Sequence, residues 1–256
     1  HNRLTGDDKK ARLEAAKATE VTTFLTGLFE QADPLVALGE ALTVRAVLDS
    51  GAVRVPRDLA GQPALQAALL HTLGDIYDNL GEPGRAERLL REAVALQRTE
   101  GDPAARADAL GAHGEARRTL DRTDEAQPSL EEALRLHAQT RGPRHAATGW
   151  TLSELGTLKR ETGAYDEAEA HYREAIAVQR ALGDEAIPEL ARTLGRLGLL
   201  FERFGQFDDA VPLLTEALAL QRQAHGDAHP NVAAALQNLG IVQRERGDDG
   251  AAEQAY

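Results

Sequence analysis

The sequence has no cysteine, no methionine, few aromatic residues and no long apolar run, and each absence excludes a class of protein. Without cysteine there is no disulfide framework, thiolate metal site or cysteine nucleophile. A membrane-spanning helix needs about 18 or more consecutive apolar residues, so we expect no direct membrane insertion by this chain. The net charge of −12 over 256 residues argues against nucleic-acid binding, which requires a basic face.

Motifs for catalysis and cofactor binding are also missing. The sequence contains no kinase signature, phosphate-binding loop, H-E-x-x-H string or EF-hand loop. We therefore predict no catalytic residue, no cofactor and no metal ion. His225 and His229 have a spacing that can chelate a metal on a helix, but the surrounding glycine and proline favour a loop. An enzyme remains the rival hypothesis from another class, and it would need a nucleophile–base or metal constellation that we do not find.

What the sequence does contain is an internal repeat. The strings EAVALQR, EALRLHA, EAIAVQR and EALALQR begin 40, 42 and 42 residues apart. A glycine inside a helix costs roughly 1 kcal/mol relative to alanine, so glycines at a fixed phase indicate helices that approach closely. The phase glycines are Gly74, Gly114, Gly156, Gly198 and Gly240, and the alanines twelve residues after them are Ala86, Ala126, Ala168, Ala210 and Ala252.

The recurring glycines and alanines predict an all-α protein, a right-handed α-solenoid of stacked antiparallel helix pairs. In the second repeat Asp121 replaces the helix-ending glycine and His113 replaces a leucine, which predicts a local irregularity. Left-handed glycines are expected to end the first helices at Gly81, Gly163, Gly205 and Gly247. The second helices are predicted to have N-caps at Asp124, Asp166 and Asp208, with Pro128 and Pro212 in the first turn.

The pattern resembles the tetratricopeptide repeat. Its 42-residue period and its G-D-x-H-P loop, Gly226 to Pro230, resemble the kinesin-light-chain variety of that repeat. The resemblance covers residues 66–256, about 4.5 repeats with the last one truncated. It implies a scaffold that binds a protein or an extended peptide segment in its concave groove.

The first 65 residues differ from the repeats. Residues 1–34 predict an amphipathic helix with a juxtamembrane-like or capping role, and the alternative is a coiled-coil stem for self-association. Residues 35–65 predict a degenerate half-repeat, with a helix from Ala41 to Val55 and a break at Pro56. The leading His1-Asn2 without a methionine predicts an excised fragment, and we expect the natural protein to continue past Tyr256.

A second resemblance concerns residues 10–80. The string AKATEVTTFLTGLFEQADP and the segments after it resemble the region that follows the membrane span in bacterial serine/threonine protein kinases with tetratricopeptide tails. This resemblance implies a membrane-associated signal-transduction parent, with the repeats on the extracytoplasmic side of the inner membrane. The alternative is a cytoplasmic scaffold or peptide-sensing domain of a regulator with no kinase attached.

The first helix of each pair is expected to line the concave side. Predicted groove residues are acidic in the early repeats and more basic later, so a segment with a basic and an acidic part would complement them. Asn238 matches the asparagine that binds the ligand backbone in kinesin-light-chain-like repeats. The alternative is a solvated face neutralised by pairing, with Trp150 packed between repeats. The predicted groove residues are Asp75, Asp78, Asn79, Glu115, Arg118, Trp150, Glu154, Thr157, Arg160, Arg196, Arg203, Gln237, Asn238 and Arg244, and the same helix face also holds His71, Asp108, Ser153, Arg192 and Glu202.

Overall fold

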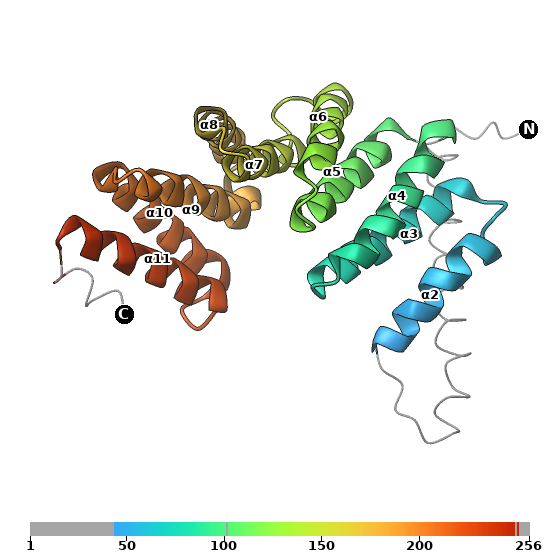
Figure 1. Cartoon of the computed structure of the whole chain (residues 1–256), viewed down its shortest axis with the longest axis horizontal. Coiled ribbons are helices and arrows are strands. Elements are labelled where there is room, and N and C mark those ends of the chain that lie inside the picture. The colour runs from blue at the N-terminus through green and yellow to red at the C-terminus, as the bar shows by residue number, and fades with distance from the viewer. Residues whose placement is uncertain (1–43, 101, 249, 251–256) are drawn as a thin grey trace, which may run out of the picture. The chain divides into compact units, whose positions relative to one another are not determined.

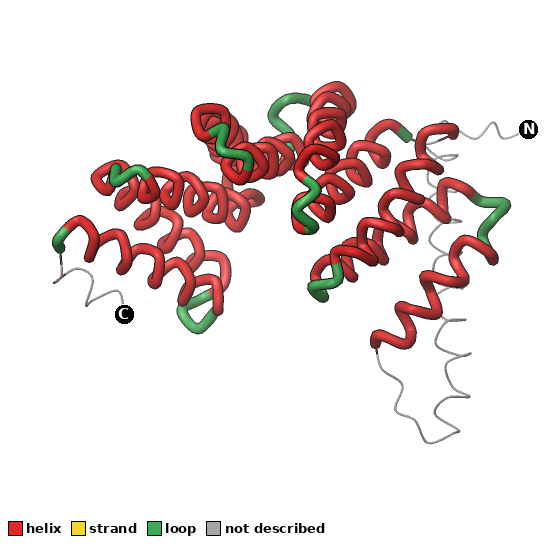
Figure 2. Tube along the Cα trace, viewed as in Figure 1, coloured by secondary structure: helices red, strands yellow, loops and turns green. Residues whose placement is uncertain are grey.

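The computed structural model of the chain describes residues 44–100, 102–248 and 250, which form helices joined by short loops (Figure 1). The predicted helix of residues 1–34 lies outside the described residues. No strand occurs in the described part of the chain (Figure 2), so the all-α prediction is confirmed. The helices are α2 (Val44–Asp58), α3 (Pro63–Asn79), α4 (Pro83–Glu100), α5 (Pro103–Thr119), α6 (Thr123–Thr140), α7 (Ala146–Glu161), α8 (Tyr165–Leu182), the 3-10 turn η1 (Gly183–Ala186), α9 (Ile187–Arg203), α10 (Phe207–His225) and α11 (Pro230–Arg246).

The chain divides into two compact units, His1–Ala105 and Arg106–Tyr256. In the first unit α3 packs against α4 and α2 packs against α3. The buried Tyr77 donates its hydroxyl proton to Asp49 Oδ1 over 2.5 Å and so ties α3 to α2. In the second unit α7 packs against α8, α9 against α10, and α10 against α11, as stacked helix pairs require. No described helix is long and apolar enough to cross a bilayer.

The glycine columns mark the points where the two helices of a pair touch. A methyl group on Gly114 would lie 2.6 Å from Cγ of Leu130, and one on Gly198 would lie 2.8 Å from Cγ of Leu214. Both distances are below van der Waals contact, so only glycine allows the facing leucine to pack at this depth. The recurring alanines lie on the opposing helices and are fully buried, at Ala86, Ala126, Ala168 and Ala210.

The ends of the first helices follow the prediction. Gly81, Gly163, Gly205 and Gly247 have positive φ angles of 73°, 81°, 69° and 89°. Asp121, which replaces the glycine in the second repeat, has a φ of 59° and therefore adopts the same left-handed conformation. Aspartate is among the few residues that tolerate this region, so the predicted irregularity does not interrupt the turn.

The predicted starts of the second helices need correction. Helix α6 begins at Thr123 and its N-cap is Arg122, so Asp124 is a first-turn residue and not the cap. The same shift of two residues applies to Asp166 in α8 and Asp208 in α10. These carboxylates still interact favourably with the positive end of the helix dipole.

The prolines also lie deeper in the helices than predicted. Pro128 and Pro212 are inside α6 and α10, and α2 continues through Pro56 to Asp58. Each proline removes one helical hydrogen bond, and at the exposed Pro128 and Pro212 the carbonyl left unbonded can be hydrated.

Two histidines cap the first helices of their pairs, a function that was not predicted from the sequence. His145 precedes α7, and its Nδ1 accepts a hydrogen bond from the Ala147 amide over 3.1 Å. His229 precedes α11 and accepts from the Asn231 amide over the same distance. His225, the last residue of α10, stacks on His229 with the ring centroids 4.3 Å apart. The histidine pair therefore has a structural function in the turn between α10 and α11.

Candidate functional site

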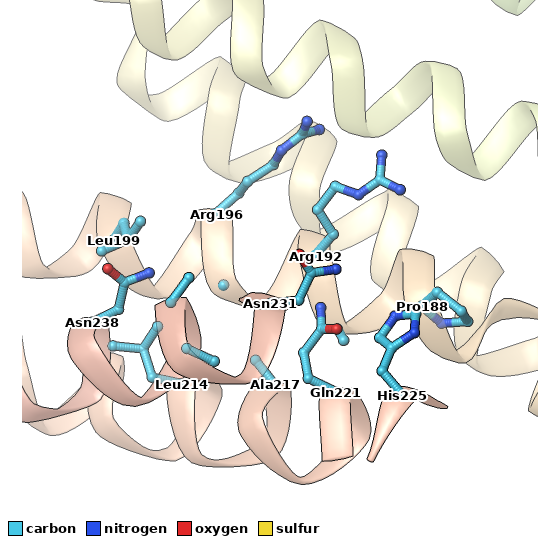
Figure 3. A pocket seen from close by; sticks show the side chains of 14 residues that line it. Pro188, Arg192, Arg196, Leu199, Leu214, Ala217, Gln221, His225, Asn231 and Asn238 are labelled. Carbon is cyan, nitrogen blue, oxygen red and sulfur yellow. The ribbon is translucent and has the colours of Figure 1, made fainter. Parts of the chain in front are cut away.

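The second unit contains a groove between α9 and α11 with α10 as its floor (Figure 3). The cavity has a volume of about 440 Å³. Helix positions that recur every three or four residues place the lining side chains on the facing surfaces of the three helices. The principal lining residues are Pro188, Arg192, Arg196 and Leu199 from α9, Leu214, Ala217, Gln221 and His225 from α10, and Asn231 and Asn238 from α11.

The lining of this groove is basic and rich in amides. Its permanently charged side chains are Arg192 and Arg196, and none of the residues that line it is a carboxylate. Arg192 is 45% exposed and donates to Glu189 over 2.7 Å, an exposed pair one turn away on the same helix. Such pairs contribute little, so Arg192 can exchange this partner for another anion at small cost.

Arg196 joins the groove to the interior. Its Nη1 donates to Glu154 Oε1 over 2.7 Å and to Ser153 Oγ over 2.9 Å, while 22% of its side chain is exposed. Glu154 has no exposed surface, and Arg118 Nη2 lies 3.5 Å from its other oxygen. Burial alone would lower the pKa of Arg196, but the Glu154 carboxylate outweighs burial and raises it, so Arg196 carries a permanent positive charge at the groove wall.

Two predicted groove residues are not on a solvent-facing surface. Glu154 and Thr157 lie on α7, in which every residue from 151 to 158 is buried. The Thr157 hydroxyl donates to the Ser153 carbonyl over 3.0 Å and accepts from the Tyr172 hydroxyl over 3.2 Å. The prediction of exposure was wrong because Arg118 from α5 and Arg196 from α9 pair with the Glu154 carboxylate, while Thr157 packs against Tyr172 of α8. This agrees with the alternative that pairing neutralises the charged residues.

The other predicted residues of the second unit are divided between packing and open surface. Arg196 and Asn238 line the groove, together with Arg192 from the same predicted face. Trp150 packs its ring on α5, where a methyl group on Gly111 would lie 2.6 Å from the ring, which fits a packing function. Arg118 and the half-buried Glu115 lie on α5.

Four more predicted residues lie outside the lining of the groove. Arg160 has Glu161 3.6 Å away, and Arg203 lies over the Tyr165 ring at 5.4 Å. Gln237 and Arg244 are exposed on α11. Their binding function stays a prediction.

Of the acidic residues predicted for the early repeats, Asp75 and Asp78 belong to the first unit. Asp75 lies 3.5 Å from His71 Nε2, and the Asn79 amide donates to the Asp75 carbonyl over 2.8 Å. Asp78 is half-buried on the same helix, α3. No group of three or more potential metal ligands occurs among the described residues of either unit.

Several residues of the groove were not predicted from the sequence, most notably Gln221, Asn231 and Leu199. A signal for Gln221 was available, because it ends the string EALALQ and occupies the position of Gln97, His137 and Gln179 in the other repeats. Leu199 directly follows Gly198, as the predicted groove residues Asp75, Glu115 and Thr157 follow their phase glycines, so it carried a signal as well. Asn231 carries none.

Comparisons with known proteins agree with this architecture. A model described as tetratricopeptide repeat matches residues 105–181 and 189–256, and a second one of the same description matches residues 66–102. No curated protein matches the chain.

Several solved structures share the fold. BtubC (BKLC) from P. vanneervenii is 22% identical over 82% of this chain and 85% of its own, with a TM-score of 0.68. A putative kinesin light chain with TPR-like repeats from Podosopora anserina is 23% identical over 73% and 89% of the two chains, with a TM-score of 0.60. Aspartyl phosphate phosphatase F from Bacillus subtilis is 15% identical over 98% and 63%, with a TM-score of 0.64. At these identities the likeness concerns the fold, and the family models supply the assignment: the chain belongs to the tetratricopeptide repeat family.

Proposed function

We propose that this chain is a non-catalytic interaction module that binds an extended, acidic segment of a partner protein in the α9–α11 groove. The observation that carries the proposal is the lining of the groove, where two arginines and three amides meet with no carboxylate among them. Stacked helical repeats characteristically use such concave surfaces for binding.

The chemistry of the lining suits a peptide main chain and acidic side chains. An asparagine amide both donates and accepts, so Asn231 and Asn238 can pair with the N–H and C=O groups of an extended segment. The guanidinium groups of Arg192 and Arg196 offer several donors each, and they pair with carboxylates in two-pronged geometry. Leu199 and Leu214 add apolar surface for the aliphatic parts of the ligand.

Three labelled twelve-residue peptides test this proposal by fluorescence polarisation. They share a Gly-Ser background and carry four glutamates, four lysines or no charged residue. We expect the acidic peptide to bind most tightly and to weaken as salt rises, because salt screens exposed charges. Equal binding of the three peptides, or binding of the lysine peptide alone, would contradict the proposal.

Arg192→Glu is the informative variant, with Arg173→Glu as its matched control. Both arginines are exposed and pair with a glutamate on their own helix, Glu189 and Glu169, but only Arg192 lines the groove. Reversing the charge of Arg192 should weaken the acidic peptide at least tenfold, since a close like charge repels it. The control should bind like the unaltered protein.

We also propose that these repeats form the tail of a bacterial membrane-bound serine/threonine kinase. The resemblance of residues 10–80 supports this proposal. Determining the reading frame upstream of His1 tests it. A kinase domain followed by about 20 apolar residues would support this context and an extracytoplasmic location. A nucleic-acid-binding or nucleotide-binding domain there, or a start just before Leu13, would overturn it in favour of a regulator without a kinase.

A further inference from the structure

The floor of the α9–α11 groove carries a buried amide oxygen without a partner. Gln221 is only 9% exposed, and its side chain rises from α10 into the groove (Figure 3). Its Oε1 has no hydrogen-bond partner among the described residues. Because a buried acceptor without a donor is destabilising, the chain holds an unfavourable group at the point where a ligand would lie.

The same position in the other repeats provides a comparison. His137 occupies the equivalent position in α6, and its ring nitrogens lie 3.0 Å from Thr151 Oγ1 and 3.1 Å from Asp108 Oδ1. The fold can therefore supply partners to a polar side chain at this position. In α4 and α8 the equivalent Gln97 and Gln179 also have a buried Oε1 without a partner, so an unpaired glutamine oxygen recurs at this position, but neither residue lines the groove. Gln221 is the member of this series that a groove ligand can reach.

We propose that Gln221 determines specificity by accepting a hydrogen bond from a neutral donor side chain of the bound segment, namely Asn, Gln, Ser or Thr. The inference rests on the proposed function. Successive side chains of an extended segment point in opposite directions, so one set faces the floor while the main chain runs past Asn231 and Asn238. The terminal torsion of glutamine is broad, so rotation about it turns Oε1 into the groove without moving α10.

The chemistry of the floor selects this class of side chain. Leu214 and Ala217 make the rest of the nearby floor apolar, so an apolar ligand side chain would fit there and leave Oε1 without a donor. A carboxylate can accept only from the Nε2 group of Gln221 and leaves Oε1 without a donor. A neutral donor satisfies Oε1 at the point where water is excluded, and the gain for one such bond corresponds to about tenfold in affinity.

A random twelve-residue peptide library displayed on phage tests the inference. It is selected in parallel on the unaltered protein, on Gln221→Met and on Gln179→Met. Methionine keeps the length of glutamine and removes its amide, and Gln179→Met makes the same change one repeat earlier, outside the groove. We expect acidic peptides with a donor side chain enriched at one position, on the unaltered protein and on Gln179→Met.

One selected peptide, resynthesised with its donor and with leucine in its place, gives the quantitative test. The leucine version should bind the unaltered protein about tenfold more weakly, whereas Gln221→Met should bind both versions equally and weakly. Gln221→Glu, which retains acceptor oxygens, should keep the preference for the donor and serves if the methionine variant does not fold.

Failure of this inference alone and failure of the proposed function give different results. Acidic peptides without a preferred donor position, or the same donor preference on Gln221→Met, would overturn the inference and leave the groove function standing. If no peptide is selected, or if Arg192→Glu binds the selected peptides unchanged, the proposed function and this inference both fall.

Discussion

Arg196 on α9 donates a 2.7 Å hydrogen bond to Glu154 on α7, a carboxylate with no exposed surface. The pair crosses from one repeat to the next, and Arg118 approaches the same carboxylate from α5. One buried charge thus connects the first helices of three successive repeats. The same arginine lines the groove, so the groove wall depends on the packing of the repeats.

Glu154→Gln should therefore destabilise the second unit. Removing the charge leaves the partly buried Arg196 without its carboxylate partner and Arg118 with Glu161 alone, and breaking a buried pair costs about 3 kcal/mol. The free energy of unfolding in urea measures the change. Glu169→Gln is the matched control, because Glu169 pairs with the exposed Arg173 and its loss should cost less than about 1 kcal/mol. Equal effects of the two substitutions would contradict this account of Glu154.

Replacing either of two glycines of the second unit by alanine should change the stability of the fold, in opposite directions at the two positions. A methyl group on Gly156 would lie 2.6 Å from the ring of the buried Tyr172, so Gly156→Ala should lower stability by about 1–3 kcal/mol. Nothing lies within 4 Å of a methyl group on Gly195 inside α9, so Gly195→Ala should raise stability by about 0.5–1 kcal/mol. Thermal unfolding of both variants checks the signs, and a loss of stability in both would contradict the close-approach argument.

The helix pairs were predictable because they depend on residues that recur at a fixed separation. Gly114 and Leu130 illustrate this, since the sixteen-residue step between them returns at Gly198 and Leu214. The burial of Glu154 was not predictable from its own helix, because it depends on Arg118 and Arg196 from other repeats. Periodicity alone marks the face of a helix, and the long side chains of neighbouring helices decide whether that face meets solvent.

The candidate site was only partly predictable for a related reason. The repeat pattern marks Gln221 and His137 as the same position, yet His137 finds two partners and Gln221 Oε1 finds none. That difference arises from Asp108 and Thr151, which no local pattern associates with position 137. The two histidine caps were missed because histidine is not a preferred N-cap residue.

The cap at His145 should contribute measurably to stability. His145→Ala removes the acceptor for the Ala147 amide and should cost about 1 kcal/mol. His145→Asn supplies a side-chain oxygen at the same position and should recover most of the loss. Urea unfolding of both variants distinguishes a capping function from general packing, which asparagine would not restore.

Asp108 should make the second unit sensitive to acid. Burial alone would raise its pKa, but hydrogen bonds with His137 and from Arg141 outweigh burial and lower it from 3.8 to about 2. Because the folded-state pKa is the lower one, its contribution is fully present above pH 4 and is lost as the pH falls from about 4 to 2. It amounts to at most about 2 kcal/mol.

Asp108→Asn removes this dependence. The stability difference between the unaltered protein and Asp108→Asn, measured in urea, should be largest near pH 6 and should shrink toward pH 2. Asp124→Asn, an exposed first-turn position of α6, controls for general effects of charge removal. A difference that stays constant over this range would contradict the assignment of the low pKa to the Asp108 contacts.

The most direct test of the central claim is to map the bound peptide by NMR. The ¹⁵N-labelled chain is titrated with the acidic twelve-residue peptide, and its side-chain amide signals are followed. We predict that Asn231 and Asn238 shift and saturate together, while Asn79 in the first unit stays unchanged. Shifts confined to residues outside the α9–α11 groove, or no shift at peptide concentrations that saturate the polarisation signal, would contradict the account.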